Sequence, residues 1–549
     1  MALTRPGDRR AGTASARTRA HDVCWHHMRT LALLLAFALV TPAAEIIDAS
    51  ANARIRQEAI EKSQVMRHLS VLADRYGPRM TGSPNYEAAA RWAAAELTSW
   101  GLKNANLEPW DFGHPGWVNE RAAGFLTAPS KDNLVLEVLA WTPSTKGRAR
   151  SSVVQIEPPS PASKEELTAY LAANAAKVKG KIVMVGKAVA VPVSFAPVNK
   201  RQTDEAAKAR YSGQGQGGGP RGPGDRPKPD PTKLTTAQAT EMIDAWLVSN
   251  KALVKVMDGG MAHGMIRAFH NRTYDLKKAV PTVILRNEDY GRAARLLARG
   301  EQVAMEFEIV NKLFPAGKTT FNVVAEIPGS DKADEVVIIG GHLDSWHAAT
   351  GATDNGTGVA AMMEAVRVLQ ASGLKPRRTV RIALWSAEEQ GLLGSKEYVK
   401  AHFGTFENPK GAFEKLVAYF NLDSGTGRIR GASVFGPAEA AAAMREILAP
   451  FADYGVAGAA ATSSRREGGT DSTSFSAAGL TAVGLGQDPI EYFTHTWHTN
   501  LDTYERVVPD DMMKASAVIA SAVWHVANRN EPLPRFKADV MPKPAVQTE

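Results

Sequence analysis

The chain contains almost no cysteine. Of its 549 residues one is a cysteine, Cys24, and it lies close to the start. The region around it has the pattern of a leader that is removed, so the mature chain would carry no thiol. Disulfide bridges and thiolate metal sites are therefore excluded. Any bound metal ion would take its ligands from histidine and carboxylate side chains.

Long apolar runs and basic stripes are also scarce. The apolar run Leu31–Val40 is too short to span a bilayer as a mature helix. No later apolar run reaches the length of a membrane span either. The formal net charge is +8, but lysine and arginine do not alternate with aromatic residues, which argues against nucleic-acid binding. No G-x-S-x-G turn follows a predicted strand, which argues against a metal-free serine hydrolase.

The beginning of the chain has the pattern of a secretory signal peptide. Met28 and Arg29 precede the apolar run, and small residues follow it up to Ala44. We expect the signal to start at Met28 and residues 1–44 to be removed. The mature chain would then be exported, to the periplasm or out of the cell, without a membrane span.

Changes of composition along the chain predict an inserted domain. Residues 45–115 begin with helical patterns, and residues 116–312, here called the insert, carry short β-type runs such as "NLVLEVLAW" and "KIVMVGK". Within the insert, residues 212–231 are so rich in glycine and proline that we expect a disordered loop. The host domain resumes over 313–530, and 531–549 form a tail.

The second host segment predicts the fold class. "NVVAEIP", "EVVIIGG", "TVRIALWS" and "LVAYFNLD" are apolar runs of strand length, and helical patterns such as "GVAAMMEAVRVLQASG" lie between them. Buried strands that alternate with helices are typical of α/β proteins. We expect a three-layer fold with a mostly parallel, mixed sheet, helices on both of its faces, and the β-rich insert as an addition.

Polar side chains follow these strands at the point where each strand ends. In open α/β sheets, sites form outside the carboxyl ends of the strands. Each such residue alone is more often a turn former or an ordinary loop residue, but their coincidence at the ends of consecutive strands favours a site. The residues are His342, Asp344, Asp354, Glu388, Glu389, Asp423, His498 and Asp502.

Two histidines and several carboxylates suit zinc or a similar divalent ion. Asp354 opens a glycine-rich turn and could bridge two ions. One of the adjacent glutamates Glu388 and Glu389 would bind metal while the other takes a proton from a water. We expect the Asp344 carboxylate to accept the second N–H of His342, and Asp502 to do the same for the other histidine.

The motifs "GGHLDSW", "ATDNGTG", "WSAEEQGLLGS", "NLDSG", "GGTDSTSF" and "HTNLDT" resemble those of the co-catalytic two-zinc exopeptidases, the family of leucyl aminopeptidases and plasma glutamate carboxypeptidases. The resemblance covers about residues 320–525, and "YGPRMTGSPN" extends it weakly toward the start. "KGKIVMVGK" and "AVPTVILRNEDYGRAARLLARG" make the insert similar to a protease-associated domain.

The resemblance implies two zinc ions and a role for each matching residue. Glu388 would be the general base. The peptide after the bridging aspartate, Asp354–Asn355, would be cis, as it often is in the family. The metal ligands would be His342, Asp354 as the bridge, Glu389, Asp423 and His498.

One position departs from the pattern. Trp497 stands where close relatives carry histidine and others carry a tyrosine that can hydrogen-bond the developing oxyanion. Tryptophan offers an indole N–H alone. His495 or Tyr492 could replace that donor, although both could equally be structural.

The resemblance implies a secreted zinc-dependent exopeptidase that acts on peptides, foremost an aminopeptidase. A carboxypeptidase or dipeptidase on the same scaffold is the alternative, and an arginine clamp at Arg465 or Arg466 would favour it. A non-catalytic binding protein would have lost ligands, and none is missing here.

Overall fold

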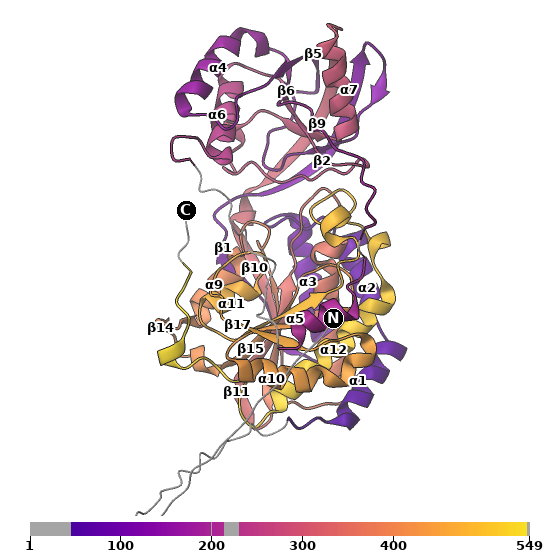
Figure 1. Ribbon diagram of the computed structural model, residues 1–549, viewed down its shortest axis with the longest axis vertical. Helices are drawn as coiled ribbons and strands as arrows, with labels where there is room; N and C mark the ends of the chain where they lie inside the picture. Colours follow the sequence, from indigo (N-terminus) through magenta and orange to yellow (C-terminus); the bar gives the residue numbers. More distant parts are fainter. Residues whose placement is uncertain (1–44, 199, 214–229, 546–549) are drawn as a thin grey trace, which may run out of the picture. The chain divides into compact units, whose positions relative to one another are not determined.

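The computed structural model describes residues 45–198, 200–213 and 230–545 (Figure 1). The expected signal region 1–44 and most of the glycine- and proline-rich stretch 212–231 lie outside these residues. Within the described part of the chain, no helix is both long enough and apolar enough to cross a membrane.

The first sheet has eight strands and is mixed, as predicted. Strands β11, β12, β15 and β18 pair in parallel at its centre, and β1 and β10 extend it antiparallel at one edge. In spatial order the strands are β1 (Lys103–Asp111), β10 (Thr319–Ile327), β12 (Arg378–Trp385), β11 (Lys332–His342), β15 (Leu416–Leu422), β18 (Ala482–Gln487), β16 (Ile429–Phe435) and β17 (Ala459–Thr462).

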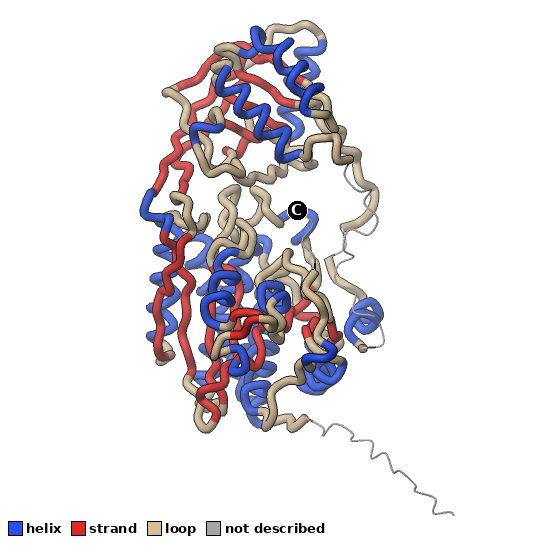
Figure 2. The backbone as a smooth tube through the Cα atoms, turned by 90° about the vertical axis from the view of Figure 1, so that its left-hand side faces the viewer, coloured by secondary structure: helices blue, strands red, loops and turns tan. Residues whose placement is uncertain are grey.

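Helices cover both faces of this sheet (Figure 2). Along β11, Val337 and Ile339 pack into one apolar core, while Val336 and Ile338 pack into another, because successive side chains of a strand point to opposite faces. The first core includes α1 (Ala49–Glu61), α2 (Val65–Ser70), α3 (Pro84–Ser99), α8 (Thr357–Ala371), α10 (Ala438–Leu448) and α12 (Pro509–Asn528). The second includes α9 (Leu393–His402) and α11 (Ser472–Ala477). A short hairpin, β13 (Gly404–Thr405) and β14 (Asn408–Pro409), follows α9.

The insert forms a second eight-stranded sheet with helices of its own. The order is β3 (Asp132–Asn133), β2 (Gly116–Ala128), β9 (Ala304–Phe314), β5 (Arg148–Ile156), β6 (Ile182–Val185), β7 (Val254–Asp258), β8 (Thr282–Leu285) and β4 (Leu136–Val138). Helices α4 (Lys164–Val178) and α6 (Thr236–Ser249) pack on one face, and α7 (Asn287–Ala298) packs on the other.

Helix α4 was not predicted, because the β-type runs of the insert indicated short strands there. Its start is well specified: Ser163 accepts from the backbone of Glu166, and the Glu166 side chain accepts from Ser163 N. The helix-like pattern of residues 237–256 does not form one helix, because a strand follows α6. The helix ends at Ser249, and Val254–Asp258 form β7.

A segment of the insert leaves its own sheet and packs on the first one. This segment, Lys200–Tyr211, is called the strap. It contains α5 (Asp204–Tyr211). Tyr211 is buried against Gly431 and Gly486, where an added Cβ would collide with its ring or hydroxyl. Arg201 pairs with Asp511 at 2.5 Å. No sequence pattern predicted that this segment packs on the first sheet.

Candidate metal centre

Six predicted residues converge at the carboxyl edge of the central parallel strands. His342 ends β11, Glu388 and Glu389 follow β12, and Asp423 follows β15. Asp354 lies in the turn before α8, and its peptide bond to Asn355 is cis, as the resemblance implied. The sixth residue, His498, lies between β18 and α12. Residues more than 150 positions apart thus meet because their strands are neighbours in one sheet.

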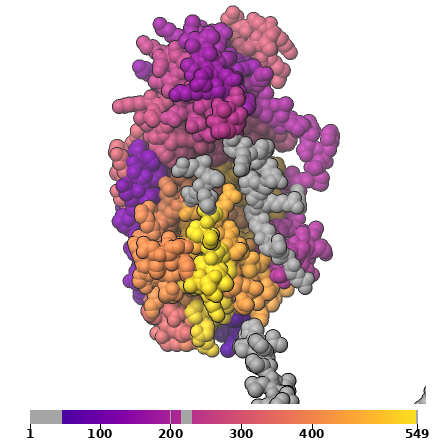
Figure 3. Space-filling view, turned by 60° about the vertical axis from the view of Figure 1, so that its left-hand side comes forward, coloured from indigo at the N-terminus to yellow at the C-terminus, as the bar shows by residue number. Residues whose placement is uncertain are grey.

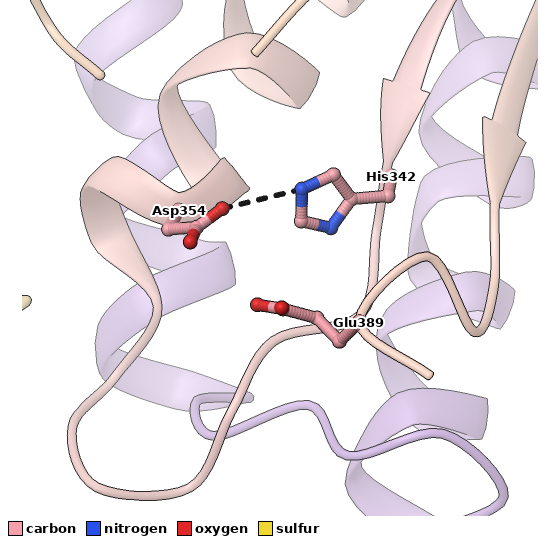
Figure 4. Close-up of side chains that lie close together, drawn as sticks. All are labelled: His342, Asp354 and Glu389. Atoms are coloured by element: carbon pink, nitrogen blue, oxygen red, sulfur yellow. Dashed lines mark ion pairs between the residues drawn. The ribbon is translucent and has the colours of Figure 1, made fainter. Parts of the chain in front are cut away.

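Asp354 lies between the two imidazoles. Its Oδ1 is 3.2 Å from Nε2 of His342, and its Oδ2 is 3.1 Å from Nε2 of His498. Figure 4 shows the Asp354 carboxylate facing His342, with the Glu389 carboxylate pointing toward the space beside them. The same two nitrogens each have one more carboxylate neighbour. Asp423 is 3.4 Å from His342 Nε2, and Glu389 is 3.0 Å from His498 Nε2.

These atoms suit a pair of divalent cations. Buried atoms without a hydrogen-bond partner include His342 Nε2, Asp354 Oδ2, Glu389 Oε1 and Asp423 Oδ1. Buried polar atoms are almost always satisfied, so several unpartnered atoms that lie close together indicate a site that binds a ligand. The donor set of imidazole nitrogen and carboxylate oxygen, without sulfur, is that of zinc sites with hard ligands. The residues present therefore fit two divalent metal ions.

The electrostatics also indicate a site built for positive charge. Burial lowers the pKa of His498, but Glu389 and Asp354 outweigh it and raise that pKa to about 10. Burial raises the pKa of Glu389 to about 7, and it raises the pKa of Glu388 well above its ordinary value although His342 opposes this. Crowded acids that resist ionisation and imidazoles that attract protons are both expected where cations belong.

The orientation of His342 is fixed differently from the prediction. Its Nδ1 donates to the backbone carbonyl of Asp344 at 3.0 Å, whereas the nearer carboxylate oxygen of Asp344 is 3.6 Å away. The carbonyl therefore sets the tautomer and leaves Nε2 free to bind a metal. The residue was predicted correctly, but the atom was not, because a two-residue spacing does not distinguish side chain from backbone.

The Asp344 carboxylate instead holds the glutamate turn. It accepts from the backbone N–H groups of Glu388 and Glu389 at 3.2 and 3.3 Å. Thr81 donates to the same carboxylate and accepts from Ala387 N at 2.9 Å. These bonds position the general-base candidate, and they explain why "MTGS" lies next to the site although the chain places it far upstream.

The prediction that Asp502 orients His498 is wrong. The Asp502 carboxylate accepts from the backbone N–H groups of Thr353 and Asp354, at 2.5 and 3.1 Å. Nδ1 of His498 has no hydrogen-bond partner among the described residues. Asp502 thus secures the turn that presents the bridging candidate.

Two further residues at the site were not singled out from the sequence. Arg79 is fully buried and donates to the carbonyls of Leu343 and Gly351. These hydrogen bonds connect the segment that follows His342 to the turn that precedes Asp354. Asp471 of "GGTDSTSF" is buried too, and burial raises its pKa to about 7 in the neighbourhood of His342 and Asp423. The motif was recognised, but no role was assigned to its aspartate.

An open pocket leads from the candidate ligands to the surface. Its lining includes Tyr492, Phe493 and Trp497, and also Pro544 and Ala545 of the tail. Figure 3 shows the tail, in yellow, lying on the surface of the host domain. Arg465 donates to Ala477 O and to Pro542 O of the tail and pairs with Glu407, so its guanidinium is occupied by these groups.

The insert contacts the site directly. Ile266 N donates to Asn500 Oδ1 at 2.9 Å, and Arg267 forms a β-bridge with Thr499. Phe269 packs edge-on against the His498 ring, with 5.3 Å between the centroids. Part of the insert therefore borders the candidate metal ligands.

Comparison with known proteins agrees with this geometry. Residues 322–523 match the sequence profile of peptidase family M28. The chain is 27% identical to carboxypeptidase Q of Rattus norvegicus over 467 residues, which are 85% of this chain and 86% of that protein. A peptidase M28 precursor from Shewanella amazonensis SB2B superposes with a TM-score of 0.62 and 26% identity, over 89% of this chain and 98% of that one.

A more distant structure shows the same fold. A zinc aminopeptidase from Bacillus subtilis superposes with a TM-score of 0.53 at 18% identity, over 87% of this chain and 98% of that one. The motifs, the convergence of their residues at one edge of the sheet and the family match agree with one another. The chain is therefore a metallo-exopeptidase similar to the peptidases of family M28, whose profile its residues 322–523 match, and this similarity confirms the resemblance inferred from the motifs.

Proposed function

We propose that this chain is an exported exopeptidase that uses two zinc ions to hydrolyse peptide bonds at chain ends, foremost as an aminopeptidase. The position of Asp354 carries the proposal, because its two oxygens face two imidazoles 3.2 and 3.1 Å away. His342 and Asp423 would hold one ion, Glu389 and His498 the other, and Asp354 both. When bound, such a pair polarises the scissile carbonyl and makes a water acidic near neutral pH.

Glu388 is the proposed general base. Its carboxylate lines the pocket beside Asp354 and Asp423, and its backbone is fixed by Asp344. It takes a proton from the attacking water and delivers it to the nitrogen of the leaving amine. The bond between carbonyl carbon and nitrogen then breaks, and an acid and an amine leave the site.

Tyr492 is the proposed donor to the oxyanion, because position 497, where some relatives carry a tyrosine donor, is a tryptophan in this chain. The Tyr492 ring lines the pocket together with the candidate ligands, whereas His495 bonds Thr494 at 2.8 Å and does not line it. A neutral phenol can donate to the oxygen that becomes negative in the transition state. Burial raises the pKa of Tyr492 well above its usual range, so that the hydroxyl keeps its proton.

A carboxypeptidase or dipeptidase remains the second candidate, and a specific observation favours it. The relatives that match over most of this chain include carboxypeptidase Q of Homo sapiens, 27% identical over 470 residues. Of the two candidates for the clamp, Arg465 is occupied by Glu407 and Pro542, whereas Arg466 is exposed and lines the pocket. Hydrolysis of amino-acid nitroanilides would indicate the aminopeptidase, and hydrolysis of N-blocked peptides would indicate the carboxypeptidase.

The division of labour is tested by metal content and turnover together. Glu388→Gln should keep about two zinc ions per chain but lose roughly 10³-fold in kcat, since general-base catalysis supplies a factor of that order. Asp354→Ala and the more conservative Asp354→Asn should both lose metal. Glu397→Gln, a surface change of the same type on α9, is the control. Equal loss of metal in the Glu388 and Asp354 variants would refute the assignment.

The remaining proposals concern the rest of the chain. We propose that residues 1–44 direct export, with the signal starting at Met28. Residues 116–312 would be a protease-associated domain inserted between peptidase segments 45–115 and 313–530, followed by the tail 531–549. The contacts of Ile266 and Phe269 beside His498 support a role for the insert in limiting access to the site.

A further inference from the structure

Arg267 of the insert is a cation without a counter-ion. Its guanidinium lies over the Trp497 ring, with Cζ 4.8 Å from the ring centroid. Throughout residues 45–198, 200–213 and 230–545, no carboxylate forms an ion pair with it, and its Nε is buried without a hydrogen-bond partner. The side chain is half-buried, and partial burial of a charge without a charged partner is unfavourable, so the guanidinium suits an anion that binds from outside.

The guanidinium is close to the reaction site. The Trp497 and His498 ring centroids are 4.1 Å apart, so one aromatic ring separates Arg267 from a candidate metal ligand. Its backbone is fixed there, because Arg267 bridges Thr499 and the preceding Ile266 N donates to Asn500. An extended peptide advances about 3.5 Å per residue. A charge one or two residues from the scissile bond can therefore reach this position.

We infer that Arg267 binds a carboxylate of the substrate and so restricts the enzyme to short or acidic peptides. Arginine suits this role because its planar fork can donate two parallel hydrogen bonds to a carboxylate while its face stacks on an aromatic ring. The carboxylate comes either from the free carboxyl end of a dipeptide or from an acidic side chain. The inference rests on the proposed function, since it concerns the substrate of the same site.

The experiment compares a dipeptide with its amide. For Arg267→Gln we expect kcat/KM on leucyl-glycine to fall about 10- to 100-fold, as for the loss of a charge-assisted bond. The change on leucyl-glycinamide should be small, because that substrate has no carboxylate. Arg267→Lys should recover part of the loss. Arg272→Gln, an exposed arginine of the same segment, should behave as the unaltered enzyme.

Glutamyl-glycinamide identifies the source of the carboxylate. It keeps an acidic side chain but has no free carboxyl end, so sensitivity of this substrate to Arg267→Gln would assign the site to side chains. Sensitivity of leucyl-glycine alone would assign it to the carboxyl end of a dipeptide. If Arg267→Gln affects all three substrates equally, or none of them, the inference is overturned.

A binding measurement separates this inference from the proposed mechanism. In the Glu388→Gln background, which should not turn over, the Kd for each peptide can be measured by calorimetry. Addition of Arg267→Gln should raise the Kd for the peptide acid about 10-fold or more and leave the Kd for the peptide amide unchanged. Equal Kd shifts for acid and amide would reject a carboxylate site even if the zinc assignment holds. Normal turnover by Glu388→Gln would reject the mechanism without affecting the comparison of acid and amide.

Discussion

Tyr492 is the residue on which the proposed transition-state stabilisation depends most directly. Tyr492→Phe removes the hydroxyl and keeps the ring that lines the pocket and packs against Phe493. Loss of one oxyanion donor typically costs about 10²-fold in rate. We therefore expect kcat to fall by roughly that factor while zinc content and the midpoint of thermal unfolding stay unchanged.

His495 provides the comparison for this prediction. It lies three residues further on and bonds Thr494, outside the pocket. His495→Ala should change kcat less than about 2-fold, since a surface side chain that does not reach the reacting atoms contributes little. If His495→Ala slows the reaction and Tyr492→Phe does not, the oxyanion donor has been assigned to the wrong residue.

Single residues at the site could be predicted from the sequence because their elements dictate their position. A histidine or acid directly after a buried parallel strand must lie at the carboxyl edge of the sheet, and His342 and Asp423 do. Which atom each supporting residue uses could not be predicted. Asp344 orients His342 through its carbonyl, and Asp502 bonds a backbone turn, because loop geometry rather than spacing decides such bonds.

At the scale of elements, the strap connects the insert to the loop that carries Tyr492. Ile490 N donates to Lys200 O at 2.8 Å, and Lys200 pairs with Glu491 at 2.9 Å. Arg201 lies between Asp488 and Asp511, which are both buried. The strap therefore supports the pocket from outside the sheet.

Tyr211 should be the main anchor of the strap. Tyr211→Ala removes a fully buried ring from a space shaped by Gly431 and Gly486, and large-to-small changes of this kind cost about 3 kcal/mol or more. We expect a lower midpoint of thermal unfolding and a lower kcat/KM, because the loop before Tyr492 loses its support. Lys208→Ala, on the exposed side of α5, is the control, and equal behaviour of the two variants would contradict the role of the strap.

Elements differ in how well the sequence predicts them. Helix α8 and strands β11, β12 and β15 were predicted because each has a single strong period and clear ends. Helices α4 and α5 were not. Helix α5 has eight residues of which two, Ala207 and Tyr211, are buried, so its apolar pattern is too weak to detect. Its partner surface comes from strands more than 200 positions away, which no local pattern shows.

At the scale of the whole molecule, the fold class followed from the alternation of strands and helices, whereas the contact between insert and host did not. That contact uses aromatic residues from distant parts of the chain. His347 of the host bonds Val138 O of the insert at 2.6 Å, and His270 of the insert stacks on Trp346 of the host at 5.4 Å. Nothing in the sequence links these residues, because they meet through folding alone.

These two histidines predict how the contact responds to acid. Burial lowers the pKa of both His347 and His270 to about 4, and each Nδ1 is buried without a partner. In the unfolded chain a histidine has a pKa near 6.5. Between pH 6.5 and 4 the unfolded state therefore binds more protons than the folded state, and the stability falls as the pH is lowered through this range.

The measurement is the midpoint of thermal unfolding between pH 7 and 4.5. His347→Gln keeps an N–H that can reach Val138 O but does not titrate, so we expect its midpoint to fall less steeply with acid than that of the unaltered chain. His263→Asn, at an exposed position of the insert with a φ of 61° that asparagine tolerates, should leave the slope unchanged. A similar flattening in both variants would mean that acid acts through exposed charge. An unaltered slope in His347→Gln would mean that His347 titrates normally in the folded chain, and that the contact between insert and host is not the part of the molecule that acid weakens.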